Sequence, residues 1–241
     1  MEIALFGANG QTGRLVTASA LQAGHRVRAV TRRPREFPLA GTGLTVVAAD
    51  VRDASAVQSV VAGVDAVVST LGVAFTREPV ETYSVGTANI VAAMGAASTR
   101  RLVVVSSSAA FPMRRSRVPL GLRLIEPILT RTIGKTVYAD IRRMEGVVRD
   151  SGLDWTIVRP SGLFDLPAPT DYVRGETNPV GAFTARIDLA DYLVALATDP
   201  MIAGRTVIVS TTENAPSLWQ MIRREAGSRE GTQPAPERTT P

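Results

Sequence analysis

The sequence predicts an α/β fold with a doubly wound parallel sheet, the Rossmann arrangement. Short runs rich in Val, Ile and Ala alternate with stretches of helical spacing. Most of these runs are apolar at successive positions rather than at every second one. Strands that are apolar on both faces belong to a sheet covered on both sides, as in parallel sheets built from alternating β and α units.

The same pattern places the elements in order. We expect strands at 3–6, 27–31, 44–48, 66–69, 102–106, 155–158 and 207–210. We expect helices near 11–23, 53–62, 80–98, 136–150 and 188–198, the last of these N-capped by Asp188, and another near 216–226. The length of 241 residues suits one domain, over 1–226. The Pro- and Thr-rich segment 227–241 predicts a disordered tail.

Composition excludes several kinds of chemistry. The chain has no cysteine and a single histidine, His25, which rules out thiolate metal sites and a Ser-His-Asp triad. We assign His25 no function and expect no metal. The formal charge of +5 is carried by scattered arginines with few aromatic residues between them. This distribution does not favour nucleic-acid binding.

No apolar run reaches the roughly 18 residues of a membrane span. Met1 is followed directly by an acidic residue and a strand-like run rather than by a signal peptide. We therefore expect a cytoplasmic protein without a membrane partner.

A glycine-rich turn connects the first strand to the first helix. Its spacing is G-x-x-G-x-x-G. Glycine permits a tight reversal and lets a diphosphate approach the backbone, while the amides and dipole of the helix N-terminus attract the anion. The expected cofactor contacts in this turn are Gly7, Asn9, Gly10, Gln11, Thr12 and Gly13. The alternative is a turn that is merely tight.

The end of the second strand indicates which dinucleotide binds. An NAD site usually carries Asp or Glu there, to bind the ribose 2′-hydroxyl. This chain instead has Arg32, Arg33 and Arg35. Arginine pairs bidentately with a 2′-phosphate, so we predict NADP(H), with Arg32 as the first contact and Arg33 or Arg35 as the second. A solvated basic loop is the alternative.

Three further strand ends fall on the same edge of the sheet. Asp50 and Val51 follow the third strand, where a carboxylate can accept a hydrogen bond from the adenine amino group. Leu71 and Gly72 follow the fourth strand, where glycine lets the chain pass close to the cofactor. Serines 106–108 end the fifth, and a hydroxyl there can bind a substrate carbonyl or stabilise developing negative charge. Alternatively, they only close the strand and cap the next turn.

Several stretches resemble the NAD(P)H-binding atypical short-chain dehydrogenase/reductases, most closely the biliverdin reductase B/flavin reductase branch and more distantly the NmrA-like proteins. They are "FGANGQTGR", "GTANIVAAM", "VVVSSSAAF" and "DIRRMEGVVRDSGLDWTIVRPSGLFD", and the resemblance spans about residues 1–210. It implies that Gly7, Asn9, Gly10 and Thr12 hold the diphosphate, Arg32 the 2′-phosphate, Asp50 and Val51 adenine, and Leu71 and Gly72 the middle of the cofactor. It places Ser106 and Ser108 beside the nicotinamide, with a serine facing the substrate.

Typical short-chain dehydrogenases use Tyr-x-x-x-Lys, whereas this chain has Tyr138 followed by Arg142. Arginine could bind the ribose or lower the tyrosine pKa, but it remains protonated and does not relay a proton. Tyr138 is therefore a secondary candidate for the acid. The alternative is a solvated helix face linked by Arg142–Glu145 and Glu145–Arg149 pairs.

The long segment after the sixth strand, beginning at Pro160, predicts a C-terminal segment that covers the substrate. We expect Pro160 at the cofactor edge. Phe164, Tyr172 and Phe183 could stack on a planar substrate or pack with one another.

Taken together, these features predict an NADPH-dependent oxidoreductase that passes hydride to a small planar, conjugated acceptor such as a flavin, quinone or enone. Two alternatives stay open: a non-catalytic NADP(H) sensor of NmrA type, and a tailoring ketoreductase or cofactor-assisted isomerase. We expect a monomer or homodimer.

Overall fold

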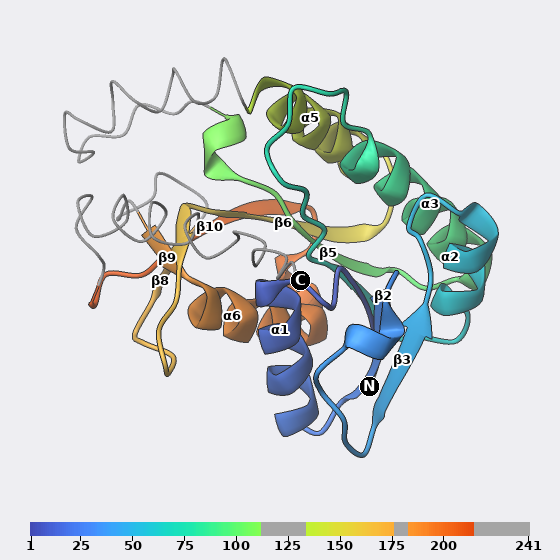
Figure 1. Ribbon diagram of the computed structural model, residues 1–241, viewed down its shortest axis with the longest axis horizontal. Helices are drawn as coiled ribbons and strands as arrows, with labels where there is room; N and C mark the ends of the chain where they lie inside the picture. The colour runs from blue at the N-terminus through green and yellow to red at the C-terminus, as the bar shows by residue number, and fades with distance from the viewer. Residues whose placement is uncertain (112–133, 176–182, 215–241) are drawn as a thin grey trace, which may run out of the picture.

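The computed structural model describes residues 1–111, 134–175 and 183–214. An eight-stranded sheet crosses the molecule in the order β3-β2-β1-β4-β5-β6-β10-β8 (Figure 1). All its neighbouring strands are parallel except β8, which pairs antiparallel with β10. The main strands are β1 (Glu2–Phe6), β2 (Arg26–Thr31), β3 (Leu44–Ala48), β4 (Ala66–Ser69), β5 (Arg101–Val105), β6 (Asp154–Pro160) and β10 (Arg205–Ser210).

Helices cover both faces of this sheet (Figure 1). One face carries α2 (Ala54–Val61), α3 (Thr82–Ala97) and α5 (Lys135–Arg149), and the other carries α1 (Gln11–Gln22) and α6 (Arg186–Thr198). Short 3-10 turns lie at η1 (Pro34–Glu36), η2 (Ser108–Ala110) and η3 (Pro200–Ile202).

The first strand shows how one short segment serves two cores. Ala4 and Phe6 pack into the core beneath α2, α3 and α5. Ile3 and Leu5 point the other way, into the core beneath α1 and α6. Because side chains alternate along a strand, a segment that is apolar throughout must be covered on both sides.

The strand order reverses at β1, which lies between β2 and β4. In an open α/β sheet, ligands bind at such a reversal, outside the carboxyl ends of the strands. The turns that follow β1 and β4 both emerge there. The fold therefore assigns the candidate site to this edge, as the sequence predicted.

The seven expected strands and five of the six expected helices are confirmed, with ends within two residues of those expected. The segment after β6 is more structured than a loop, because it contains β7 (Gly162–Phe164), β8 (Val173–Gly175) and β9 (Phe183–Ala185). Each has three residues, too few for a periodic pattern to reveal, and each forms by pairing with a distant strand. The expected helix near 216–226 and the tail 227–241 lie outside the described residues.

The predicted N-cap of α6 is wrong. The helix begins after Ala185, and Asp188 lies in its first turn with its side chain fully buried. Its carboxylate accepts hydrogen bonds from Thr170 N (2.8 Å) and Thr211 Oγ1 (2.6 Å). Asp188 therefore holds the segment after β7 and the end of β10 against α6.

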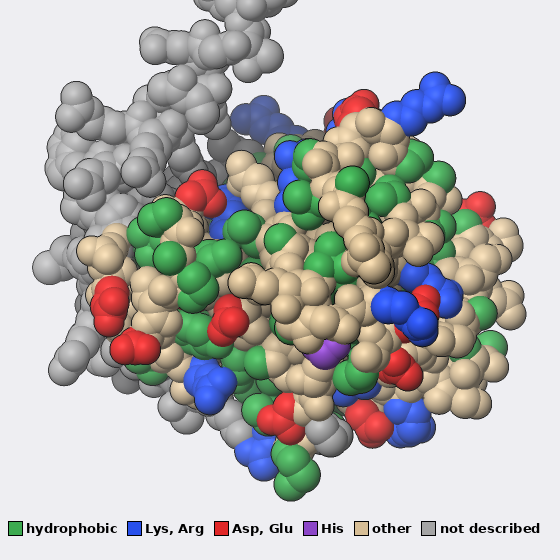
Figure 2. Space-filling model, turned by 90° about the horizontal axis from the view of Figure 1, so that it is seen from below, with side chains coloured by type: hydrophobic (Ala, Val, Ile, Leu, Met, Phe, Trp, Pro, Cys, Tyr) green, Lys and Arg blue, Asp and Glu red, His purple; other side chains and the backbone are tan. Residues whose placement is uncertain are grey.

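No helix in the described ranges combines the length and apolar character that crossing a membrane requires. On the face shown in Figure 2, acidic and basic side chains are interspersed.

Candidate functional site

The outer two glycines of the turn after β1 are required by geometry. Gly7 has a φ of +80°, and a Cβ there would lie 2.6 Å from Thr70 O in the loop after β4. A Cβ on Gly13 would lie 2.3 Å from Gly7 O. Gly7 thus permits the reversal beside the neighbouring strand, and Gly13 lets α1 pack closely on the turn.

Gly10 differs, because an added Cβ there would make one tight contact rather than a severe clash. It is exposed and has extended backbone at the N-cap of α1, and a Cβ would come no closer than 3.3 Å to Gly7 O. Among the residues that the structure describes, no side chain caps α1, and the first turn of this helix contains no acidic residue. The first amides of a helix have no intrahelical acceptor, so this cradle suits the diphosphate of a dinucleotide.

Arg14 lies at the candidate site, although the sequence analysis did not single it out. Its guanidinium donates from Nε to Asn9 O (3.0 Å) and from Nη2 to Asn9 Oδ1 (2.8 Å). These bonds fix the Asn9 side chain on the turn and place a positive charge beside it. The sequence feature that could have indicated it is the position of this arginine directly after the last glycine of the motif.

The arginines after β2 have different surroundings. Arg33 pairs with Glu36 at 3.0 Å, and both side chains are largely exposed. Arg32 is also exposed, and in the described part of the chain no carboxylate lies within ion-pair distance of it. Its charge acts on Asp50, at the neighbouring strand end.

Asp50 is held as a carboxylate. Arg52 donates to it from Nη2 (3.0 Å) and from its backbone N–H (2.9 Å). These two hydrogen bonds lower the pKa of Asp50, and the charge of Arg32 adds to the effect. The next residue, Val51, is buried, and its carbonyl accepts a hydrogen bond from Asn89 Nδ2 (3.0 Å).

The loop after β4 runs beside the glycine turn and then toward α5. Leu71 packs against the core, and Gly72 is exposed with no atom within 4 Å of an added Cβ. Further along, Phe75 is 57% exposed, and its ring lies 5.8 Å from that of Tyr138. Thr136 Oγ1 donates to Thr76 O (2.9 Å), which ties this loop to the first turn of α5.

At the end of β5 the serines occupy different environments. Ser106 is buried, and its hydroxyl donates to Glu145 Oε1 (2.5 Å). Ser107 accepts from Ala109 N (3.2 Å) and caps η2. Ser108 is buried as the first residue of that turn.

The alternative of a solvated helix face is wrong for Glu145, whose side chain is fully buried. The Glu145–Arg149 pair does form, at 2.5 Å. Arg142 instead donates to Ala110 O (3.0 Å) and so fastens α5 to the turn that contains Ser108. Tyr138 lies one helical turn earlier and is half-buried.

Pro160 is buried at the end of β6, beside β10. The three aromatic residues after it pack within the protein. The rings of Phe164 and Phe183 meet edge-to-face at 6.3 Å, and both are buried. Tyr172 lies against Tyr192 at 5.9 Å. The packed-core alternative describes these residues better than stacking on a substrate.

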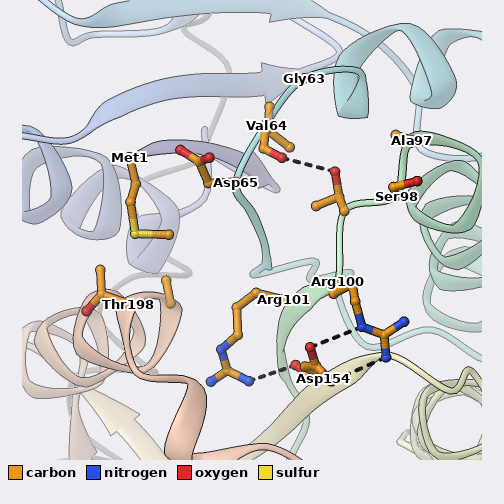
Figure 3. A pocket seen from close by; sticks show the side chains of 12 residues that line it. Met1, Gly63, Val64, Asp65, Ala97, Ser98, Arg100, Arg101, Asp154 and Thr198 are labelled. Carbon is orange, nitrogen blue, oxygen red and sulfur yellow. Dashed lines mark hydrogen bonds and ion pairs between the residues drawn. The ribbon is translucent and has the colours of Figure 1, made fainter.

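A hollow of about 520 Å³ lies at the opposite edge of the sheet, where β4, β5 and β6 begin (Figure 3). Arg100 and Arg101 both point toward Asp154 there. Arg100 pairs with the Asp154 carboxylate at 3.2 Å, and Arg101 donates to the Asp154 carbonyl at 2.8 Å. These three residues therefore bind one another beside the hollow.

The geometry of the glycine turn agrees with comparison to known proteins. Residues 7–200 match the family described as NAD(P)H-binding. The chain belongs to this family. Membership confirms the predicted resemblance to NAD(P)H-binding proteins.

Among curated relatives, (4-alkanoyl-5-oxo-2,5-dihydrofuran-3-yl)methyl phosphate reductase of Streptomyces griseus is 34% identical over 158 residues, covering 66% of this chain and 46% of that enzyme. The chain spans less than half the length of the curated relatives that it matches at over 30% identity.

Solved structures share the fold. The Escherichia coli O157:H7 protein ChuY, an anaerobillin reductase, superposes with a TM-score of 0.71 at 22% identity, covering 90% of this chain and 100% of ChuY. A Veillonella parvula short-chain dehydrogenase/reductase in complex with NADP gives a TM-score of 0.70 at 21% identity, covering 90% and 99% of the two chains.

Proposed function

We propose that this protein is an NADPH-dependent reductase that acts on a small planar, conjugated acceptor. The observation that carries the proposal is the pairing of two features at one sheet edge. An uncapped helix N-terminus opens onto the Gly10 cradle, and the exposed Arg32 follows the neighbouring strand where an NAD site would carry an acid.

Charge supports NADPH over NADH. A carboxylate at the end of β2 would repel a 2′-phosphate, whereas the guanidinium of Arg32 attracts it. Arg33 is already paired with Glu36, which leaves Arg32 as the principal contact and Arg33 as an additional positive charge. Asp50 and the backbone of Val51 would border the adenine, while Leu71 and Gly72 would line the middle of the cofactor.

The chain's own groups would bind and orient the acceptor. NADPH, when bound, supplies the hydride. Ser108 would donate a hydrogen bond to the acceptor carbonyl, and Ser106 would help to orient the acceptor. Tyr138 is the candidate proton donor, Arg142 would bind the ribose, and both lie on α5, which also fastens the Ser108 turn.

Names of similar proteins support a conjugated acceptor. The Streptomyces relative is named as a reductase whose substrate carries an alkanoyl and an oxo group on a dihydrofuran ring. ChuY is named as an anaerobillin reductase. The Veillonella structure contains NADP, which accords with the choice of NADPH here.

The test follows NADPH absorbance while the purified protein is incubated with FMN, a quinone or an enone. NADPH binding is measured in parallel by fluorescence. We expect binding and consumption with at least one acceptor. Ser108→Ala should lower kcat at least tenfold with little change in NADPH affinity, a size typical of a lost oxyanion donor. Ser59→Ala, an exposed serine on α2, is the matched control and should change neither. Tight binding without consumption of any acceptor would contradict the reductase and favour a sensor of NmrA type.

A further inference from the structure

Ser106 and Arg159 lie side by side at the carboxyl edge of the sheet. Val105 in β5 is in register with Val158 in β6, so the next residue of each chain segment continues the pair. Glu145, which α5 projects onto this edge, contacts both.

Glu145 is the centre of a buried network. Arg159 binds it in bidentate fashion, from Nε to Oε1 (2.8 Å) and from Nη2 to Oε2 (2.6 Å). Arg149 adds a third donor, at 2.5 Å from Oε2, and Ser106 a fourth, at 2.5 Å from Oε1. The Arg159 guanidinium also lies over the Phe111 ring, 3.6 Å from its centroid. A bidentate pair stacked on an aromatic ring is rigid, so the carboxylate has a fixed position.

This network determines which way the Ser106 proton points. A carboxylate flanked by two guanidinium groups only accepts hydrogen bonds, and a serine hydroxyl has one proton. Ser106 donates that proton to Glu145. Turning it elsewhere would leave the buried Glu145 carboxylate with one hydrogen-bond donor fewer. The Ser106 oxygen therefore offers only lone pairs to any ligand.

We propose that Glu145 is a positioning residue that makes Ser106 an acceptor for the nicotinamide carboxamide N–H of the cofactor. This inference rests on the proposed function. The carboxamide is the donor-bearing group of the nicotinamide, and an acceptor-only serine at the end of β5 suits it. The polarising role toward the substrate carbonyl then falls to Ser108 rather than to Ser106.

The test compares two ligands that differ only in that donor: NADPH and its reduced 3-acetylpyridine analogue, in which a methyl group replaces the amide nitrogen. Dissociation constants for both are measured by fluorescence, without any acceptor, in the wild type, Ser106→Ala and Glu145→Gln. Ser59→Ala is again the control. In S106A the preference for NADPH over the analogue should fall about fivefold relative to the wild type, the size of one hydrogen bond.

The preference for NADPH over the analogue should fall in E145Q as well. The glutamine amide can donate to the Ser106 oxygen, so that the hydroxyl proton of Ser106 points away from residue 145. A purely structural effect would weaken the binding of both ligands equally and leave the ratio of their dissociation constants unchanged. If E145Q does not fold, S106A decides alone, since it leaves Glu145 with both arginines. An unchanged ratio in S106A overturns the inference even when NADPH is bound and consumed. Failure of the wild type to bind NADPH overturns the proposed function together with the inference.

Discussion

Asp140 of α5 caps the first turn of α3 by accepting the backbone N–H of Tyr83 at 2.8 Å. The residue at the N-cap position, Glu81, makes no such bond. The buried Asp140 carboxylate also accepts from the Ser84 hydroxyl and from Arg143 Nη2 (3.1 Å). A capping group separated by more than fifty residues in sequence thus joins the two helices that flank the loop after β4.

Replacing Asp140 with Ala should lower the free energy of unfolding by about 2–4 kcal/mol, because it leaves the buried Tyr83 amide without its acceptor and removes the ion pair with Arg143. Asp140→Asn, which keeps one acceptor oxygen, should lose less. Urea unfolding measures both. Asp150→Ala, at an exposed position just after the same helix, is the control and should stay within about 0.5 kcal/mol of wild type. Equal effects of D140A and D150A would contradict the cap.

Substitutions at two glycines of the first turn should have different effects, one mainly on stability and the other mainly on NADPH binding. Gly13→Ala should cost about 1–3 kcal/mol of stability, because its Cβ would meet Gly7 O at 2.3 Å. Gly10→Ala should lose less stability than Gly13→Ala, since its Cβ would approach only Gly7 O, at 3.3 Å, and the backbone is extended. Its methyl group would occupy the space for the diphosphate, so NADPH affinity should fall at least tenfold. Thermal unfolding and fluorescence titration test the pair, and a destabilised G10A with unchanged affinity would refute this assignment.

Much of the fold was predictable from local pattern. Segments such as 66–69 are apolar on both faces, and a buried parallel strand is the structure that satisfies them. The glycine turn was also predictable, because Gly7 has a positive φ and a Cβ on Gly13 would clash with Gly7 O. In both cases the pattern that carries the signal is local in sequence.

What the sequence did not reveal depends on contacts between distant residues. Glu145 has the spacing of an exposed helix face, yet it is buried because Ser106 and Arg159 provide partners from two strands. Asp188 resembled an N-cap, but threonines on either side of it in sequence, Thr170 and Thr211, bind it instead. Buried carboxylates of this kind cannot be recognised until the tertiary fold brings their donors together.

Arg32 should determine the choice of dinucleotide. Arg32→Ala should weaken NADPH binding by about 10–100-fold, the range of a charge-assisted hydrogen bond, and change NADH binding by less than about threefold. Arg26→Ala, at the other end of β2 and paired with Glu2, removes the same charge far from the site and serves as the control. Fluorescence titrations with both dinucleotides provide the measurement. Equal losses for NADPH and NADH in R32A would contradict the predicted selectivity.

Tyr172 should make stability sensitive to alkaline pH. Burial is the main cause that raises its pKa, and the hydrogen bond that its hydroxyl donates to Asp191 Oδ2 (2.8 Å) raises it further. A raised pKa means that the fold favours the neutral phenol, so this stabilisation is complete below the ordinary tyrosine pKa of about 10 and is lost as pH rises through the higher folded value. Asp191→Asn should move the Tyr172 titration to lower pH, as followed by tyrosinate absorbance. Because burial also raises the pKa of Tyr83, Tyr172→Phe is needed to assign the signal. A tyrosinate curve that D191N leaves unchanged would show that Asp191 does not act on Tyr172.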